Sequence, residues 1–109
     1  MPVTMRRRAD FLAAAQARRQ GMPGFLLQAR HRGDMDAPRI GYTCSKKSGN
    51  AVARNRAKRR LRALARQVLP GAARPGWDYV LVGRPGATID RNFADMAAEL
   101  ARAIAKVHG

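Results

Sequence analysis

The chain has 109 residues, enough for one domain with a single modest core. Lys and Arg number 22 against 7 Asp and Glu, so the formal net charge is +15, and a hydrophobic share of 46% excludes a disordered basic tail. No apolar run approaches the roughly 20 residues that span a bilayer. Cys44 is the only cysteine, which excludes a disulfide framework and a thiolate zinc site and favours a reducing, cytoplasmic location.

Residues 8–20 are predicted to form an amphipathic helix that ends at the glycines and proline of residues 21–24. Phe11 and Leu12 supply its apolar anchor, although its Arg- and Ala-rich composition also resembles an organelle transit peptide. The anchor favours the helix. Residues 1–7 before it are a candidate disordered segment.

The next segment has the pattern of two short strands around a polar turn. Residues 25–31 and 39–44 have strand character, and residues 32–38 supply the turn, which predicts a hairpin. An Arg-Gly-Asp triplet at residues 32–34 resembles an adhesion motif, but ordinary turn chemistry accounts for it.

Residues 45–62 contain eight basic residues and no acidic one. Asn50 is predicted to cap a helix there. The apolar residues of this helix recur at spacings of three and four and form a core-facing stripe of Ala57, Leu61, Leu64, Ala65 and Val68. Its opposite arc is cationic, and the helix is predicted to end at Pro70 and Gly71.

Residues 77–83 are almost continuously apolar, as expected for a strand buried on both faces. A last helix, capped by Thr88 or Asp90, carries an apolar stripe from Phe93 to Val107. The predicted order is therefore α-β-β-α-β-α, an α+β sandwich in one domain of residues 1–109 with helices packed on a small sheet.

A dense positive face without counter-charges suits a polyanion, and arginine is the better phosphate clamp because its planar fork donates two hydrogen bonds at once. Nucleic acid is therefore the predicted partner. A membrane surface is the alternative, but it would need apolar anchors opposite the basic face, and the core requires that same stripe.

Catalytic chemistry by protein groups is poorly supported, and no catalytic or metal-ligating residue is predicted. His31 and His108 lack metal-ligand spacing. Asp95 and Glu99 lie one helical turn apart and could hold a divalent ion, but a solvated helix face explains them better. Cys44 is predicted to be a packed thiol.

One set of residues resembles the signature of the bacterial ribonuclease P protein subunit: Ser45-Lys46-Lys47, Gly49-Asn50-Ala51-Val52 and Arg54-Asn55-Arg56, followed by Lys58-Arg59 and Arg62. The resemblance continues through Arg39-Ile40-Gly41 and residues 78–86. The order of elements matches over nearly the whole chain, while the first 24 and the last 20 residues match in type of element and not in specific motifs.

The resemblance implies a fold like the second domain of ribosomal protein S5, with a left-handed crossover from the strand at residues 39–44 through the basic helix to the strand at residues 77–83. It also implies a cofactor protein for a catalytic RNA that removes the 5′ leader of precursor tRNA. The Mg²⁺ ions would be bound mainly by the RNA subunit. No membrane and no obligate protein partner is predicted.

The residues that the resemblance assigns to RNA binding are Lys46, Lys47, Asn50, Arg54, Asn55, Arg56, Lys58, Arg59 and Arg62. A leader-binding cleft between the first helix and the sheet would be lined by Phe11, Ala15, Phe25, Gln28 and Tyr42. Ala15 and Gln28 stand where the family often has aromatic residues, and either Phe25 or Tyr42 could instead belong to the core.

Two rival functions remain open at the level of sequence. A ribosomal-type structural RNA-binding protein of related fold would lack the leader cleft. A protein-only, metal-dependent nuclease would need a carboxylate cluster, for which the spacing of the seven acidic residues gives no indication.

Overall fold

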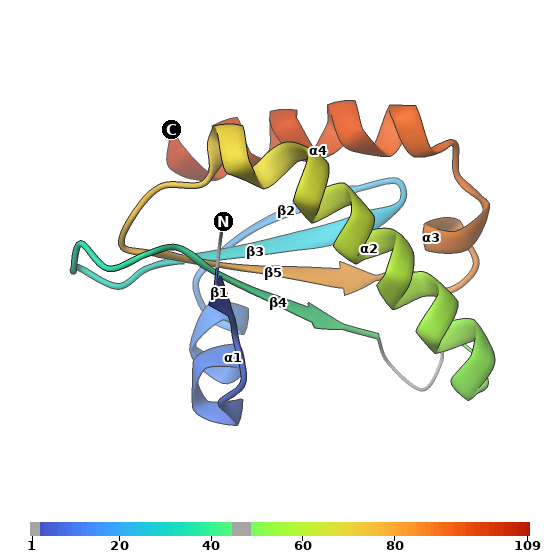
Figure 1. The fold of residues 1–109 in the computed structure, drawn as a ribbon, viewed down its shortest axis with the longest axis horizontal. Coiled ribbons are helices and arrows are strands. Elements are labelled where there is room, and N and C mark those ends of the chain that lie inside the picture. The colour runs from blue at the N-terminus through green and yellow to red at the C-terminus, as the bar shows by residue number, and fades with distance from the viewer. Residues whose placement is uncertain (1–2, 45–48) are drawn as a thin grey trace.

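The computed structural model describes residues 3–44 and 49–109 and forms a mixed sheet with helices on both faces (Figure 1). The elements are β1 (Val3–Thr4), α1 (Arg8–Ala15), β2 (Arg18–Met22), β3 (Phe25–His31), β4 (Arg39–Thr43), α2 (Ala51–Ala72), β5 (Trp77–Gly83), α3 (Ala87–Asp90) and α4 (Phe93–His108). This arrangement confirms the predicted α+β class. No helix in the described ranges is long and apolar enough to cross a membrane.

The sheet has the order β1-β4-β5-β3-β2. Strands β4 and β5 are parallel and are joined through α2, as the resemblance implies. The left-handed sense of this connection stays a prediction. The predicted hairpin between β3 and β4 is wrong, because β5 lies between them and pairs with both. Since β5 is apolar on both faces, it occupies the centre of the sheet.

The N-terminal third differs most from the prediction. The helix ends at Ala15 and not near residue 20, because residues 18–22 form β2, which pairs with β3 across a tight turn. Arg18 and Arg19 make this a charged edge strand, a common protection against edge-to-edge pairing. Residues 3–4 form β1 against β4, and Met5 is buried.

Helices α2 and α4 cover one face of the sheet, and α1 lies on the other (Figure 1). The larger core lies under α2 and α4 and includes Phe25, Tyr79, Leu61 and Leu100, all without exposed surface. A smaller cluster of Met5, Ala14 and Val80 lies beside α1, with Phe11 and Val82 packed against it. Each fully buried apolar side chain of this size stabilises the fold by about 1.5–3 kcal/mol.

The last helix is capped by Asn92, whose side-chain oxygen accepts from the backbone N–H of Asp95 at 3.0 Å. The predicted caps, Thr88 and Asp90, are therefore wrong. The buried Thr88 hydroxyl accepts from the N–H of Arg84 and donates to the C=O of Gly24, which joins the end of β5 to the β2–β3 turn.

The surroundings of His108, at the C-terminal end of α4, predict that the stability of the fold depends on pH. The Tyr79 hydroxyl accepts from the N–H of Arg74 at 3.0 Å and shares a hydrogen bond of 2.6 Å with Nε2 of His108. Burial lowers the pKa of His108 below its ordinary 6.5, and the nearby Arg74 and Arg18 lower it further.

Below about pH 6.5 the unfolded chain therefore binds a proton that the folded chain resists, and stability falls as the pH falls through this range. We expect the melting temperature to decline between neutral pH and pH ~5, and the His108→Phe variant to show a shallower decline. An equal decline in both proteins would contradict this role of His108.

Candidate RNA interface

The basic face of α2 begins at a well-formed helix start. Gly49 has φ +113°, a left-handed conformation that a side chain would strain, and the Asn50 side-chain oxygen accepts from the N–H of Ala53 at 3.0 Å. The predicted cap is thus confirmed. Burial of the apolar stripe orients the helix, with Ala57, Leu61, Leu64, Ala65 and Leu69 turned toward the core.

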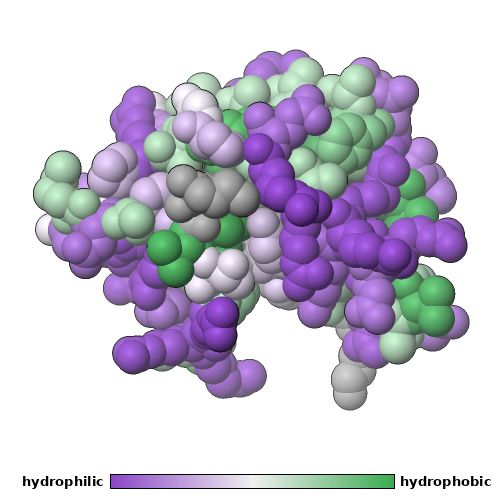
Figure 2. Space-filling view, viewed as in Figure 1, coloured by the Kyte–Doolittle hydropathy of each residue, from purple (hydrophilic) through white to green (hydrophobic). Residues whose placement is uncertain are grey.

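We define the basic face of α2 by the predicted RNA-binding residues that α2 carries: Arg54, Asn55, Arg56, Lys58, Arg59 and Arg62. Arg54 and Lys58 are half-buried, and the other four side chains are exposed. Lys46 and Lys47 lie outside the described residues. In the space-filling view, hydrophilic side chains follow the course of α2 across the molecule (Figure 2).

None of the described carboxylates forms an ion pair with this basic face. Asp10, Asp34 and Asp78 pair with arginines of the sheet and the β3–β4 loop, and Glu99 pairs with Arg91. The positive charge of α2 is therefore not neutralised internally within the described ranges.

Two arginines of α2 make contacts within the fold. Arg60 donates to the C=O groups of Thr88 and Arg91 and lies 5.7 Å from the ring centroid of Phe93, so it ties α2 to the α3 region. The Arg62 guanidinium lies 5.5 Å from the ring centroid of Tyr42, a cation–π contact. Arg60 is thus structural, whereas Arg62 keeps an exposed side chain.

A second site is a pocket of about 490 Å³ between α1 and the sheet, here called the α1–sheet pocket. Phe11, Leu12 and Ala15 line it from α1, and Gln28 and Val82 from the sheet. Arg6, Arg8, Tyr42 and Thr43 complete its border. The pocket thus combines an apolar floor with cationic residues at its rim.

Gly41 makes room for the aromatic ring of this pocket. A Cβ atom on Gly41 would lie 2.5 Å from a ring carbon of Phe11 and 3.3 Å from the sulfur of Met5. The ring therefore lies directly against the backbone of β4, at a distance that only glycine permits. This contact explains why α1 sits where the pocket can form.

Four of the five predicted cleft residues border this pocket, and Phe25 does not. Phe25 is fully buried in the larger core, because alternate residues of β3 face opposite sides and Gln28, not Phe25, faces α1. The Tyr42 ring packs against the larger core under Arg62, so it faces away from α1. Only its position on β4 brings Tyr42 to the border of the pocket.

Sequence reasoning missed Arg6 and Arg8 at the rim, and Leu12 and Val82 in the lining. The signal that could have found the arginines is the Arg6-Arg7-Arg8 run directly before Phe11. Such a run at the start of a helix that carries a partly buried aromatic residue places positive charge beside an apolar surface.

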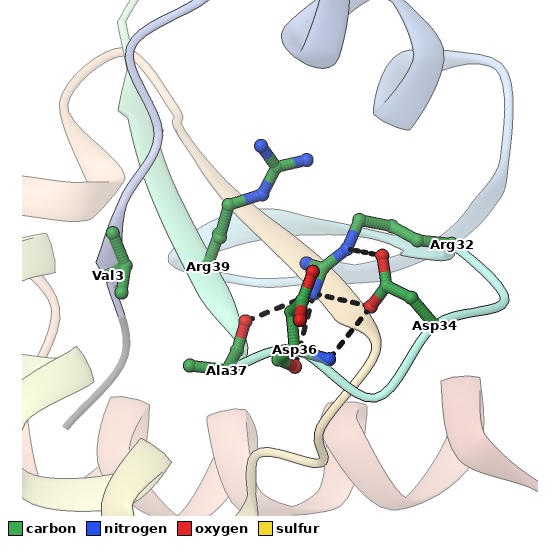
Figure 3. A pocket seen from close by; sticks show the side chains of 6 residues that line it. All are labelled: Val3, Arg32, Asp34, Asp36, Ala37 and Arg39. Atoms are coloured by element: carbon green, nitrogen blue, oxygen red, sulfur yellow. Dashed lines mark hydrogen bonds and ion pairs between the residues drawn. The ribbon is translucent and has the colours of Figure 1, made fainter.

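A network of acidic residues and arginines lies at the opposite end of β4, around a pocket of about 310 Å³ (Figure 3). Arg32 donates to Asp34, Asp78 and the C=O groups of residues 36 and 37, and its side chain is only 8% exposed. The Arg-Gly-Asp triplet is therefore turn chemistry, as predicted, because its arginine cannot reach a partner.

The same network perturbs its titratable groups. Hydrogen bonds from Arg32 hold the pKa of Asp34 below its usual value. Asp78 accepts from Arg39 at 2.7 Å on both carboxylate oxygens, which raises the pKa of Arg39. The two Arg39–Asp78 hydrogen bonds hold the start of β4 to β5.

Across the described ranges, no three His, Cys, Asp or Glu side chains converge in a way that could hold a metal ion. Glu99 is buried and bonded to Arg91 at 2.8 and 2.7 Å, so it is not free to join Asp95 around a cation.

The family model for ribonuclease P matches residues 2–108. The chain belongs to the ribonuclease P protein family. Among its relatives, the ribonuclease P protein component of Ruegeria pomeroyi is 58% identical over 106 residues, which cover 95% of this chain and 85% of that protein. The protein component of Caulobacter vibrioides is 46% identical over 101 residues, covering 92% of this chain and 67% of the relative.

Solved structures of the ribonuclease P family share the fold. The protein from Staphylococcus aureus superposes with a TM-score of 0.76 at 25% identity and covers 100% of both chains. The protein from Thermotoga maritima gives a TM-score of 0.75 at 26% identity and covers 94% of both chains. These matches confirm the family that the basic segment resembles and identify the chain as a protein component of ribonuclease P.

Proposed function

We propose that the protein binds the RNA subunit of ribonuclease P through the basic face of α2 and the 5′ leader of precursor tRNA through the α1–sheet pocket. The observation that carries this proposal is the placement of the two sites. Helix α2, whose basic face forms no ion pair with a described carboxylate, lies on one side of β4, and the α1–sheet pocket with its two arginines lies on the other.

The basic face suits the phosphate backbone of a folded RNA. Arg54, Arg56 and Arg59 offer forked donors, and the side chains of Asn50 and Asn55 add directional hydrogen bonding. Binding at this face releases counterions from the RNA and relieves the self-repulsion of a chain with net charge +15.

The α1–sheet pocket suits an unpaired nucleotide. Its volume accommodates a base, and Phe11 offers a ring for stacking, which is worth about 1–3 kcal/mol per base. Ala15 contributes no second ring, so we propose that the pocket holds the leader mainly through one stacked base and the arginine rim.

We propose that the RNA subunit carries the catalysis and binds most of the Mg²⁺ ions. Hydrolysis of a phosphodiester requires ions that activate water and stabilise the leaving oxygen, and a protein site for them needs clustered carboxylates. The described carboxylates are mostly bonded to arginines instead. In this proposal the protein acts in the cytoplasm by binding and positioning.

The protein freed of RNA is therefore expected to leave precursor tRNA intact in Mg²⁺, and cleavage should return when the RNA subunit is added. Gel analysis of the 5′ leader product measures both. Co-purification of a several-hundred-nucleotide RNA that supports this cleavage would confirm the partner. Cleavage by the protein without RNA, or co-purification of ribosomal RNA instead, would contradict the proposal.

Phe11→Ala is expected to weaken holoenzyme affinity for a precursor tRNA with a leader of several nucleotides by about 1–3 kcal/mol. Affinity for mature tRNA, which lacks the leader, should hardly change. Gly41→Ala should act in the same direction, because its Cβ would displace the Phe11 ring. Equal losses for precursor and mature tRNA would show that Phe11 only packs α1 against the sheet.

A further inference from the structure

The outer edge of β4 is covered along only part of its length. Strand β1 pairs with Arg39 and Ile40, and the last bond of this ladder runs from the N–H of Met5 to the C=O of Ile40 at 2.8 Å. The chain then turns away into α1. Figure 1 shows β4 continuing beyond β1.

Tyr42 therefore has its backbone polar groups at an open edge. In an extended strand, the N–H and C=O of one residue point to the same side, and those of the next residue point to the other. Because Ile40 faces β1, Tyr42 faces the same outer edge, while Gly41 and Thr43 face β5. Within residues 3–44 and 49–109, neither the backbone N–H nor the C=O of Tyr42 has a hydrogen-bond partner.

This open edge is continuous with the α1–sheet pocket. Tyr42 and Thr43 border the pocket although the Tyr42 ring faces the other side of the sheet, so it is the strand itself that reaches the pocket. Arg6 and Arg8 border the same pocket, on the segment that turns away from β4. The two backbone groups are thus flanked by positive charge.

The chemistry of the edge fits a nucleobase. The N–H and C=O of one extended residue form an adjacent donor and acceptor, and the base edges of unpaired nucleotides present hydrogen-bonding groups that proteins read in this way. A partner protein strand would use the same groups. However, β4 ends at Thr43 and leaves one outward-facing residue to pair, and the arginine rim favours a phosphate-bearing chain.

We propose that the backbone N–H and C=O of Tyr42 bind the base edge of one leader nucleotide, in the plane of the sheet, beside the nucleotide held against Phe11. Arg6 and Arg8 bind the phosphates that link the two. This inference rests on the proposed function, because it assumes that the leader enters the α1–sheet pocket. It adds a main-chain contact that is independent of the side chain at position 42.

The test replaces the Tyr42 N–H by an ester oxygen, using the tyrosine α-hydroxy acid, so that the ring stays in place. Holoenzyme assembled with this protein is measured against mature tRNA and against precursor tRNAs whose leaders are lengthened one nucleotide at a time. We expect affinity to fall roughly three- to tenfold, the loss of one hydrogen bond, once the leader reaches the edge. Mature tRNA and shorter leaders should bind as before.

The ester also makes the C=O of Gly41, which faces β5, a weaker hydrogen-bond acceptor. A second pair of variants controls for this effect on the sheet. Tyr42→Pro removes the N–H at an outward-facing strand position, where proline is tolerated, and Tyr42→Ala is its matched control. The proline variant should lose the same leader-dependent affinity relative to alanine.

The outcomes separate the two proposals. If wild-type holoenzyme binds precursor and mature tRNA equally, leader binding itself fails, and this inference fails with it. If the wild type prefers leader-bearing tRNA and both backbone variants keep that preference in full, the Tyr42 contact is overturned while the proposed function stands.

Discussion

Replacing Asp78 with Asn is expected to lower the free energy of unfolding by about 3–5 kcal/mol, the effect of breaking a buried ion pair. The Asp78 side chain has no exposed surface and accepts hydrogen bonds from Arg39 on both oxygens and from Arg32 on one. The amide of Asn would turn an NH₂ group toward these guanidinium donors. Chemical denaturation of the protein without RNA measures the loss.

Asp34→Asn is the matched control for this prediction. Asp34 also pairs with Arg32, at 3.0 Å, but it lies on the exposed β3–β4 loop, where solvent screens the interaction. Its denaturation midpoint should therefore stay near that of the wild type. Equal midpoints for the Asp78 and Asp34 variants would show that the buried network adds little to stability.

The double substitution of Arg54 and Arg56 by Ala is expected to weaken binding to the RNA subunit by about 1.5–3 kcal/mol for each lost charge-assisted contact, roughly tenfold or more per arginine. Neither side chain belongs to the apolar stripe of α2, so the fold should be retained. Filter binding gives the affinity, and circular dichroism on heating gives the stability.

Arg60→Ala provides the opposite pattern from the same helix. Arg60 is bonded to the C=O groups of Thr88 and Arg91. Its replacement should therefore lower the melting temperature and leave the affinity for RNA nearly unchanged. Replacing Arg54 and Arg56 by Lys keeps the charge and removes the fork, so partial recovery of affinity would separate the two contributions. A collapse of stability in the Arg54, Arg56 variant would make these residues structural.

The parts of the fold that the sequence predicts well are those with local signals. The Asn50 cap, the apolar stripe of α2 and the continuous apolar run of β5 each depend on residues close together in the chain. The pairing of β3 and β4 was predicted wrongly because strand order depends on contacts far apart in sequence. The apolar run of β5 indicates a strand buried on both faces, but it does not specify that β3 and β4 are its two neighbours.

The site shows the same division. Helical spacing predicts that α2 has an apolar and a cationic side, whereas the individual RNA-binding residues and Phe11 were assigned by the family resemblance. Phe25 was misplaced because the side chains of a strand alternate, so a one-residue difference in register exchanges the core face for the pocket face. Arg6 and Arg8 were missed because no periodic pattern marks the turn before α1 or the first residue of that helix.

The described carboxylates pair with arginines of the sheet, of the β3–β4 loop and of the α3–α4 connection, and this pairing has a kinetic consequence. Because the described acidic side chains pair with arginines outside α2, the positive charge of that helix is left uncompensated and gives the field of the protein a direction. Such a field accelerates diffusional encounter with a polyanion and orients the protein before contact. The protein would therefore meet its RNA with α2 foremost, and the pocket on the other side of β4 would stay open to an incoming single strand.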